Sequence, residues 1–581
     1  MIEHYFEDEM RYLQEAGKAF AEIHPDRARY LNADSLTDRD PHVERLFEGV
    51  AFLTARVREQ LDDDLPQYSE GLLRLLYPHL VRRIPAASIL QFTPRPGMVQ
   101  ETVSLPAGTE VRSRPVGDEH TPCRFITTTD VALQPVSLDA ARLEWPGPRT
   151  STAVLTFSVD RTADPADLDL SSLRLFFYAD PSDASRMHRF FTRCVSGLTV
   201  SAGGQTVQRT GQQWVTPAGL RPEESLLPVA PQTMSGYRLL QEYFCYRPKF
   251  WFVDLHGLDA VSAMPEAASL TVRVHFTEAY PEKWAFDQDN LRLYCTPIVN
   301  LFTTDAEPVR VTHRAAEYRV IADAKRPESV SVYDIRRVVG TPSGTGRHRA
   351  YAPFFSFPDG SDRQGPVFSE TARVGARGTV ETYVSVGAWG AGVEALQEET
   401  LTPEVRCTNG PLPREALREG DITQPGPGFA NVASFRNLTQ PSRELLPPLD
   451  RHPDLYWMLL SHLALNRTSV LSREALRHTL RLYDWADTPA TRRRIDGLRR
   501  VDWEPTEALD RGSIRRGVQV RVEVDDDHFA DDGDLALFGL VLSRFLSMYA
   551  TLNTFVQLTL TTHPSDRTLS WNPLDGRVPP L

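Results

Sequence analysis

Clustered carboxylates are the residues of this 581-residue chain whose types most readily suggest chemistry. Six aspartates fall between positions 525 and 534, in the sequence DDDHFADDGD, and hard cations such as Ca²⁺ prefer clustered carboxylate oxygens. The run fails the test of an EF-hand loop, because no starting position gives acids at positions one, three and five followed by glycine. We interpret it as a solvated turn between a strand and a helix, with acids at the start of the helix.

Asp305 and Glu307 are the carboxylates that best suggest a catalytic pair. On a strand they would point the same way, but the sequence around them has no partner pattern of a glycoside hydrolase. The segment Asp305-Ala-Glu-Pro is better explained as a turn that leads into a strand carrying Val309 and Val311.

Motifs for phosphate binding, zinc binding and nucleophilic catalysis are absent from the sequence. None of GxxxxGK[ST], HExxH, GxSxG or CxxC occurs. The run that begins Gly387-Ala-Trp-Gly-Ala-Gly lacks the GxGxxG spacing of a dinucleotide-binding loop, so we predict a flexible turn there. We therefore expect that the protein is not an enzyme and that it binds no cofactor and no metal ion.

One region of the sequence is basic. Its eight arginines are Arg492, Arg493, Arg494, Arg499, Arg500, Arg511, Arg515 and Arg516. Nucleic-acid binding has no support from the whole chain, which carries 64 Lys and Arg against 77 Asp and Glu and a formal net charge of −13. A solvated face and a protein interface both stay open, and guanidinium groups pair well with carboxylates at interfaces. We predict that Arg492, Arg493, Arg499 and Arg500 contact a partner.

Aromatic residues are dense in the segment Tyr243-Phe-Cys-Tyr-Arg-Pro-Lys-Phe-Trp-Phe. They could stack on sugars or bases, but alternation would place Phe244, Tyr246, Phe250 and Phe252 on one face of a strand. We expect this segment to form part of a domain core.

Residues 1–84 have the periodicity of amphipathic helices. After Asp40-Pro41, one apolar stripe follows helical spacing and consists of Val43, Leu46, Phe47, Val50, Leu53, Val57 and Leu61; the members expected at an interface are Val43, Phe47, Val50, Leu53 and Val57. Three such helices in about 80 residues can form a bundle with one another or with the helices of a partner. We predict that the stripe is a partner interface.

The rest of the chain changes from helical to alternating periodicity and back. Residues 85–330 predict a β-sandwich-like domain, with alternation such as Leu270, Val272, Val274 and Phe276. Residues 331–450 predict a second β-rich region with long loops. Residues 451–581 predict an α+β domain, in which a strand over Val518–Val524 and a following helix over 535–549 are expected to form an autonomous core. The predicted fold class is therefore α+β and multidomain.

Composition is that of an ordinary globular protein, with 41% hydrophobic and 24% charged residues. The five cysteines are scattered, as expected of buried thiols in a reducing compartment. The N-terminal sequence MIEHYFEDEM does not resemble a secretory signal, and no apolar run approaches the roughly 20 residues that span a bilayer. We expect a cytoplasmic protein without direct membrane insertion.

Four blocks of sequence are specific enough to compare with a known family. They are residues 40–79, residues 240–255, the stretch YCTPIVNLFTTDAEPVRV with EYRV and RPE from residue 294, and residues 516–573 with the tripeptide Trp571-Asn-Pro. In order and spacing these blocks resemble the TssF family of type VI secretion baseplate subunits, also called VasA or ImpG. The resemblance is weakest over about 96–235 and in the loops near 340–350 and 387–427.

The resemblance implies a structural subunit of the baseplate wedge, similar in architecture to the phage-tail baseplate wedge protein. Such a subunit assembles with TssG, TssK and TssE around the VgrG spike, with a second copy of TssF beside one TssG and a shared core bundle of helices. It would initiate polymerisation of the tail sheath and trigger contraction, in the cytoplasm and docked to the inner-membrane complex through the baseplate.

Two alternatives remain. A wedge protein of a phage tail or another contractile injection system belongs to the same class. A secreted β-sandwich enzyme or carbohydrate binder belongs to another class, and a signal peptide or a carboxylate pair with family spacing would favour it. Neither feature occurs in the sequence.

Overall fold

The computed structural model forms two compact units, Met1–Val81 with Leu449–Ala464, and Arg82–Pro448 with Leu465–Leu581. It describes residues 6–16 except 8 and 14, and then 45–56, 70–74, 78–160, 162–163, 168–228, 235–259, 269–342, 348–354, 365–374, 380–389, 398–427, 432–449, 455–463, 471–510, 513–551 and 553–576. The mixed architecture of several sheets and helices confirms the predicted α+β, multidomain class. The domain boundaries at 84, 330 and 450 stay predictions.

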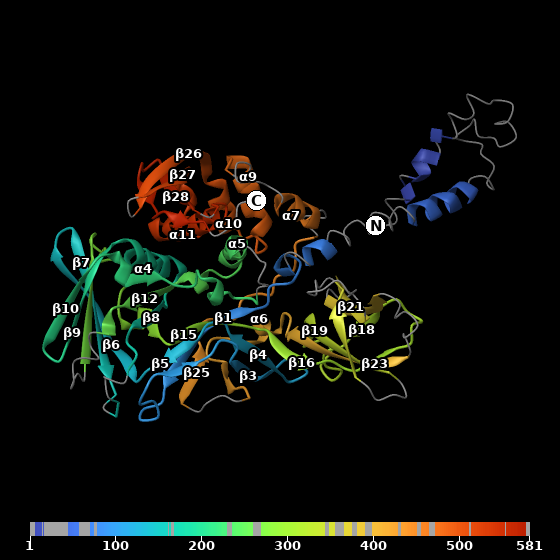
Figure 1. Ribbon diagram of the computed structural model, residues 1–581, viewed down its shortest axis with the longest axis horizontal. Helices are drawn as coiled ribbons and strands as arrows, with labels where there is room; N and C mark the ends of the chain where they lie inside the picture. The colour runs from blue at the N-terminus through green and yellow to red at the C-terminus, as the bar shows by residue number, and fades with distance from the viewer. Residues whose placement is uncertain are drawn as a thin grey trace. The chain divides into compact units, whose positions relative to one another are not determined.

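The first unit is helical in its described residues. The described residues within 6–16 are helical, as are 45–56 and 70–74, followed by the 3₁₀ turn η1 (Pro78–Leu80) and, later in the chain, α7 (Leu455–Leu463) (Figure 1). Leu455 and Leu459 of α7 are buried, and their spacing of four residues places them on one face. Helices are therefore present in the described part of the predicted helical region 1–84, and their assembly into a bundle stays a prediction.

A six-stranded sheet of the second unit joins distant parts of the chain. Its order is β24 (Ile422–Pro425), β3 (Glu110–Val116), β4 (Thr121–Thr127), β15 (Cys295–Val299), β1 (Ala87–Pro94) and β25 (Ala433–Asn437). The central strand β15 is buried along its whole length, whereas β4 alternates between buried and half-buried residues. A small neighbouring sheet pairs β2 (Val103–Leu105) with β5 (Val131–Leu133).

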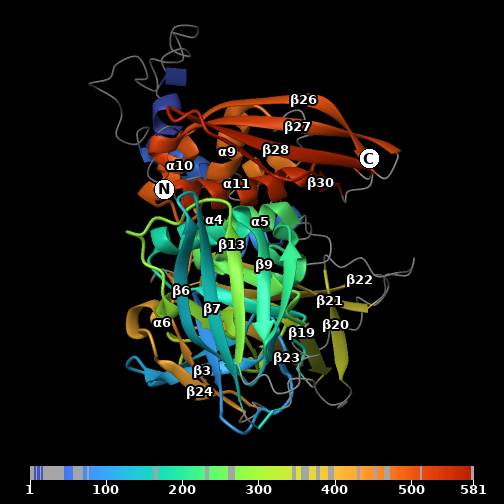
Figure 2. The ribbon, with the colours of Figure 1, turned by 90° about the vertical axis from the view of Figure 1, so that its left-hand side faces the viewer.

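Two further sheets lie in the same unit (Figures 1 and 2). One has the order β10 (Gln205–Thr210), β9 (Val195–Ala202), β13 (Ser269–Phe276), β7 (Thr150–Val159) and β6 (Val136–Gly147). The other has the order β11 (Val215–Pro217), β12 (Phe252–His256), β8 (Ser172–Phe177) and β14 (Leu291–Leu293). The expected alternation of β13 is confirmed, because Leu270, Val272, Val274 and Phe276 are buried.

An eight-stranded sheet forms from residues 302–408. Its path is β16 (Phe302–Asp305), β23 (Glu399–Thr408), β19 (Ser331–Pro342), β20 (Arg349–Pro353), β21 (Gly365–Val374), β22 (Val380–Trp389) and β18 (Tyr318–Val320), with β17 (Val309–Val311) also paired to β23. Its apolar core includes Val311, Val338, Val384 and Leu401. The short helix α6 (Leu412–Ala416) follows.

The C-terminal part combines helices with one sheet. The helices are α9 (Arg473–Tyr483), α10 (Pro489–Asp496) and α11 (Asp532–Ser547). The sheet has the order β26 (Leu498–Asp510), β27 (Ser513–Asp525), β28 (Thr554–His563) and β29 (Thr568–Ser570), with β30 (Leu574–Asp575) on β28. Because β27 and β28 are parallel, α11 is the crossover helix of a βαβ unit.

The predicted strand and helix in this part are confirmed. Val518, Val520, Val522 and Val524 are buried on β27, while the residues between them are at least partly exposed. The helix α11, however, has more than one apolar stripe. It is buried on nearly all sides, because β28 covers one side and helices α4 (Pro181–Arg193) and α5 (Ser235–Cys245) cover another (Figure 2). The expectation that this unit forms an autonomous core is therefore wrong.

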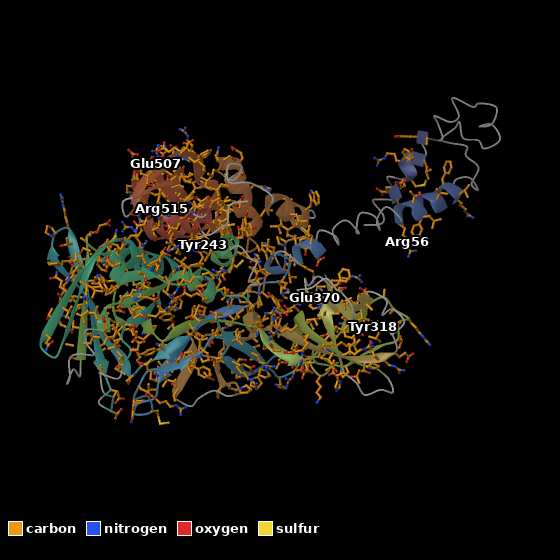
Figure 3. All side chains as sticks on the ribbon, viewed as in Figure 1. Arg56, Tyr243, Tyr318, Glu370, Glu507 and Arg515 are labelled. Atoms are coloured by element: carbon orange, nitrogen blue, oxygen red, sulfur yellow. The ribbon has the colours of Figure 1, made fainter. Side chains whose placement is uncertain are left out.

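Two predicted segments have a different structure. The segment around Tyr243 (Figure 3) is not one strand: α5 ends at Cys245, the 3₁₀ turn η5 spans Arg247–Phe250, and only then does β12 begin. Burial on all sides removes the periodicity that separates a helix from a strand. The expected role in the core is confirmed, because Tyr243 and Phe250 are each 1% exposed.

Gly387 lies in strand β22 and not in a turn. It is paired with Val367 of β21, in a register that runs without interruption from Val374 to Gly365. The glycine needs no special backbone conformation here, so a strand accommodates it, and the rest of the predicted turn, 390–392, lies outside the described residues.

Candidate functional site

An exposed apolar face on helix 45–56 is the first candidate site. Leu46, Val50 and Leu53 are 65%, 42% and 63% exposed. Their spacings of four and three residues place the three side chains on one face of the helix. Ala51 and Ala55, on another side, are fully buried. The helix therefore buries small side chains within its own unit and presents larger apolar ones to solvent.

The predicted stripe is only partly described. Val50 and Leu53 are exposed as expected, Phe47 is half-buried, and Val43 and Val57 lie outside the described residues. Leu46 belongs to the predicted stripe but not to the predicted interface, although its spacing from Val50 and Leu53 places it on the same face. The predicted interface also omits Trp457 of α7, which is 67% exposed, and no periodicity in the sequence indicated this. Exposed apolar groups of this size are typical of protein interaction sites.

The arginine region is the second candidate, and its members have two different environments. Arg494 is buried, and its Nε donates to Asp534 Oδ2 at 2.8 Å. Arg247 also donates to Asp534. Burial alone would raise the pKa of the Asp534 carboxyl, but these two arginines hold it below its ordinary value. Arg494 therefore belongs to the interior and is not available to a partner.

The four arginines that we predicted as an interface lie at the surface, each with a local acceptor. Arg492 pairs with Asp487, and Arg493 Nη2 donates to the carbonyl oxygen of Asp527 at 2.8 Å. Arg499 lies 3.8 Å from Asp525, and Arg500 lies 2.7 Å from Asp502. Exposed pairs of this kind contribute little to folding and can exchange partners. Their role as an interface stays a prediction.

A groove of about 390 Å³ lies beside these residues. It is lined by residues 471–474 and 499–503, among them Arg473, Arg500 and Trp503. Trp503 is 38% exposed, and Ile514 on the paired strand β27 is 70% exposed. Arg515 and Glu507 lie on the same two-stranded ribbon (Figure 3). Tryptophan and arginine are enriched among the residues that contribute most of the binding energy at protein interfaces.

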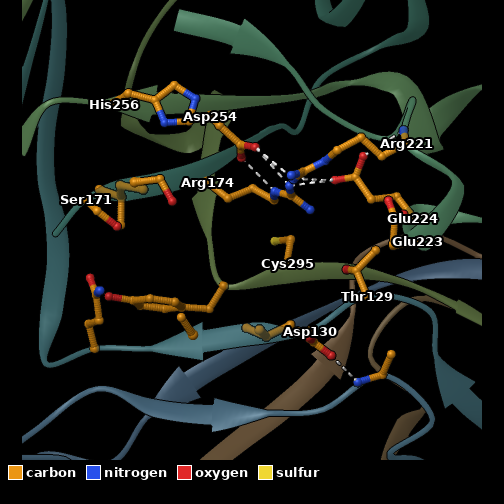
Figure 4. Close-up of a pocket in the computed structure, with 17 residues that line it drawn as sticks. Thr129, Asp130, Ser171, Arg174, Arg221, Glu223, Glu224, Asp254, His256 and Cys295 are labelled. Carbon is orange, nitrogen blue, oxygen red and sulfur yellow. Dashed lines mark hydrogen bonds and ion pairs between the residues drawn. The ribbon is translucent and has the colours of Figure 1, made fainter. Parts of the chain in front are cut away.

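A cavity of about 600 Å³ in the second unit allows a test for catalytic chemistry (Figure 4). Arg174 of β8 spans its wall, with Nε 2.7 Å from Asp254 Oδ1 and Nη2 2.7 Å from Glu224 Oε1. Glu224 also accepts hydrogen bonds from the backbone N–H groups of Gly219 and Arg221. The buried carboxylates are thus fully engaged in holding β8, β12 and the turn Pro222–Glu224 together.

Two titratable groups of this cavity, Glu224 and Cys295, have pKa shifts that do not suit catalysis. Burial acts to raise the pKa of Glu224, but Arg174 and the Arg221 backbone hold it below its ordinary value, so Glu224 has no proton to donate at neutral pH. Burial raises the pKa of the Cys295 thiol, which therefore stays protonated. A carboxylate that acts as a general acid needs a raised pKa, and a thiol that acts as a nucleophile needs a lowered pKa.

Other chemically suggestive residues have structural roles. Asp531 caps α11 by accepting from the backbone N–H of Asp534, and Asp525 caps the turn Asp526–His528, so the predicted acids at the start of the helix are confirmed. The prediction that the run is solvated is wrong for Asp534, which is buried. Asp305 and Glu307 are exposed and lie at the predicted turn between β16 and β17. Burial lowers the pKa of Lys249 to about 8, although the charge of Glu242 acts to raise it. The Lys249 side chain is only 1% exposed, so it lies in the interior.

Metal clusters, reactive thiols and membrane-spanning helices are the remaining features that could carry a function. No group of three or more His, Cys, Asp or Glu among the described residues could hold a metal ion. All five cysteines are free thiols, four of them buried and Cys245 half-buried. No helix in the described part of the chain is both long and apolar enough to cross a membrane.

Comparison with known proteins gives consistent matches over the whole chain. The family model described as "Type VI secretion system, TssF" matches residues 1–578. The protein "Type VI secretion system component TssF1" of Pseudomonas aeruginosa is 30% identical over 622 aligned positions, which cover 99% of each chain.

Two solved structures contain similar chains. One is the cryo-electron microscopy structure of the type VI secretion system TssK-TssF-TssG baseplate subcomplex, in which the similar chain has a TM-score of 0.80 and 33% identity over 93% of this chain and 100% of that chain. The other is the baseplate complex from the type VI secretion system, with a TM-score of 0.63 and 31% identity over 100% of both chains.

Proposed function

This chain belongs to the TssF family of the type VI secretion system, and on this basis we propose that it is a structural, non-enzymatic subunit of the baseplate wedge. Its partners are TssG, TssK, TssE and a second copy of the same chain, arranged around the VgrG spike. In this role it helps to initiate the tail sheath and to trigger contraction, in the cytoplasm and docked to the inner-membrane complex through the baseplate. The solved subcomplex of a similar chain with TssK and TssG supports the first two partners.

The exposed apolar face of helix 45–56 is the observation that carries this proposal. Leu46, Val50 and Leu53 present aliphatic side chains to solvent at helical spacing. Burying such a side chain fully contributes about 1.5–3 kcal/mol, so three of them supply a substantial part of an interface. An amphipathic helix that meets the apolar face of a second helix is a recurring mode of recognition. The chemistry of the face therefore fits a helical, apolar surface of TssG.

The test is co-purification of the full chain with TssG after a charge is placed on this face. We expect Val50→Asp and Leu53→Asp to abolish co-purification, because a carboxylate cannot be buried there without a partner. Circular dichroism should show the β-sheet signal unchanged, since these residues lie in the first unit.

A matched control comes from the same helix. Arg45 is exposed and lies about 100° around the helix from Leu46, so Arg45→Asp adds the same carboxylate off the apolar face. It should leave co-purification intact. Unchanged binding by Val50→Asp and Leu53→Asp, or equal loss with Arg45→Asp, would contradict the proposed interface.

A further inference from the structure

A second, smaller cavity of the second unit lies at the C-terminal end of α4. Its volume is about 200 Å³, and α4, α11 and the turn from β29 to β30 supply most of its lining. The residues important here are Arg193, Arg544, Ser570, Trp571 and Asn572. The motif Trp571-Asn-Pro, which the sequence marks as a family feature, therefore forms one wall of a cavity.

Arg193 is held in a fixed position in this wall. Its guanidinium stacks over the ring of Trp571, 4.4 Å from the centroid, and its Nη2 donates to the carbonyl oxygen of Ser570 at 2.9 Å. Trp571 itself is buried, and it contacts α11 closely enough that a Cβ on Gly539 would lie 2.1 Å from the ring. A guanidinium group has five N–H donors, so these contacts orient the group while using only part of its capacity.

Two arginines, Arg193 and Arg544, and no carboxylate are among the described residues that line the cavity. No carboxylate of the described residues lies within ion-pair distance of Arg193, and nearby Glu278 is paired with Arg189 at 2.8 Å. In agreement with this geometry, burial and the charge of Arg189 lower the pKa of Arg193. Carboxylates, by contrast, raise the pKa of Arg174 against its burial.

We propose that this cavity binds the carboxylate of an aspartate or glutamate side chain of a partner protein in the baseplate. The proposal rests on the proposed function, because it needs a partner. The volume of the cavity is below the 300–1,000 Å³ that is usual for small-molecule sites, yet it is sufficient for one acidic side chain. Leu540 and Leu574 beside Trp571 suit the aliphatic part of that side chain. Arginine and tryptophan together are the typical composition of an interface hot spot.

The first test asks whether the full chain binds a carboxylate at Trp571. We would label the tryptophan indoles with ¹⁵N, assign the Trp571 resonance with Trp571→Phe, and titrate with glutamate blocked at both ends. The Trp571 resonance should shift with blocked glutamate and not with blocked glutamine. Arg193→Gln should weaken this response on the order of tenfold, as expected for loss of a charge-assisted contact.

Control variants show whether the response belongs to this cavity. Arg209 stacks over Trp214 at 5.0 Å and lies outside the cavity, so Arg209→Gln should leave the Trp571 response unchanged. Arg544→Gln provides a second cavity variant if Arg193→Gln lowers the melting temperature. Inorganic phosphate that shifts Trp571 at a lower concentration than blocked glutamate would overturn the proposal in favour of a free anion. No shift with blocked glutamate would also overturn it.

The second test uses the assembled complex. A photo-crosslinking amino acid at Asn572, which is exposed at the cavity, should cross-link to a partner peptide that contains an aspartate or glutamate. Replacing that acid by arginine should reduce the cross-link, and Arg193→Glu in the same complex should restore it. No cross-link, or a cross-link that survives Arg193→Gln, would count against the proposal. The proposed function is judged separately by the Val50 and Leu53 variants, so the two can fail independently.

Discussion

Arginine at neighbouring positions has two physical roles in this protein. Arg494 is buried and pairs with Asp534 in the interior, whereas Arg500 is 64% exposed and pairs with exposed Asp502. A buried pair that loses one partner leaves an uncompensated charge, and an exposed pair does not. The two roles can therefore be separated by substitution, although the arginines are close together in the sequence.

The Asp534 network should be essential for stability. Asp534→Ala would leave Arg247 and Arg494 buried without the carboxylate that both contact. We expect the free energy of unfolding to fall by about 3–5 kcal/mol, measured by urea denaturation. Asp502→Ala should change it by about 0–1 kcal/mol. Equal stability of the Asp534 and Asp502 variants would show that the network is not what holds this region.

The surface arginines should behave differently. The double variant Arg499→Glu with Arg500→Glu should melt like wild type and lower partner affinity.

A buried histidine should make stability depend on pH. His188 on α4 is fully buried, and neither ring nitrogen has a hydrogen-bond partner among the described residues. Burial lowers its pKa from 6.5 to about 4. The unfolded chain therefore binds a proton that the folded chain does not between about pH 6.5 and pH 4. Stability from this residue is complete above pH 6.5 and is lost as the pH falls to about 4.

The measurement compares the unfolding free energy of wild type and His188→Leu across this pH range. A shift of this size corresponds to about 3 kcal/mol, so the wild-type protein should lose roughly that much more than the variant between pH 7 and pH 4. Parallel pH profiles would mean that folding does not lower the pKa of His188.

Helix α11 organises the C-terminal part because it packs on both sides. Sheet strand β28 lies on one side, and α4 and α5 lie on another (Figure 2). Phe545 is fully buried, and its ring centroid lies 5.5 Å from that of Tyr237 on α5. Close approach to α4 depends on Gly533, because a Cβ there would lie 2.4 Å from the backbone carbon of Ser185.

Gly533→Ala should therefore destabilise the protein, although alanine is the better helix former. The clash is with backbone, which cannot rotate away, so we expect a cost of about 1–3 kcal/mol in thermal or urea unfolding. The control is Gly49→Ala in helix 45–56, where a Cβ would meet nothing within 4 Å. That change should increase helicity by circular dichroism. A stabilising Gly533→Ala would mean that α11 and α4 are farther apart than described.

Elements with a regular pattern could be predicted from the sequence, and their pairing could not. Strand β27 was predictable because its valines alternate with polar residues on a half-buried sheet. Helix α5 was not, because burial on all sides removes the pattern. The pairing of β1 with β25 joins residues such as Leu90 and Asn437, and no local sequence feature encodes such a distant partner.

The candidate sites likewise contain residues that could be predicted from the sequence and residues that could not. Val50 and Leu53 were predictable from helical spacing, since a short helix cannot bury every apolar residue it carries. The burial of Arg494 between exposed arginines was not predictable, because it depends on Asp534, which lies 40 residues farther along the chain. The cavity at Arg193 and Trp571 combines segments even more distant in sequence, so only the folded chain reveals it.

At the scale of the whole molecule, the buried carboxylates Glu224, Asp254 and Asp534, all in the described part of the chain, are ion-paired with arginines within the fold. Glu224, which pairs with Arg174, has a pKa below its ordinary value because Arg174 and the Arg221 backbone offset the effect of burial. We therefore expect the purified protein to show no hydrolase, nucleotidase or metal-dependent turnover. The assay uses generic ester, phosphate and glycoside substrates, with and without divalent cations. A specific turnover abolished by Glu224→Gln, with folding intact, would contradict a purely structural role.

The arrangement of the six-stranded sheet has a consequence for synthesis. Strand β1 (Ala87–Pro94) pairs with β15 on one side and with β25 on the other. Between the end of β1 and the start of β25 the ribosome adds about 340 residues, which takes roughly 17–70 s at about 5–20 residues per second. During that time the apolar strand lacks β25, and until residue 295 is made it also lacks β15; an open strand edge invites pairing with other chains. Chaperone supply during translation should therefore limit the yield of this protein more than its final stability does.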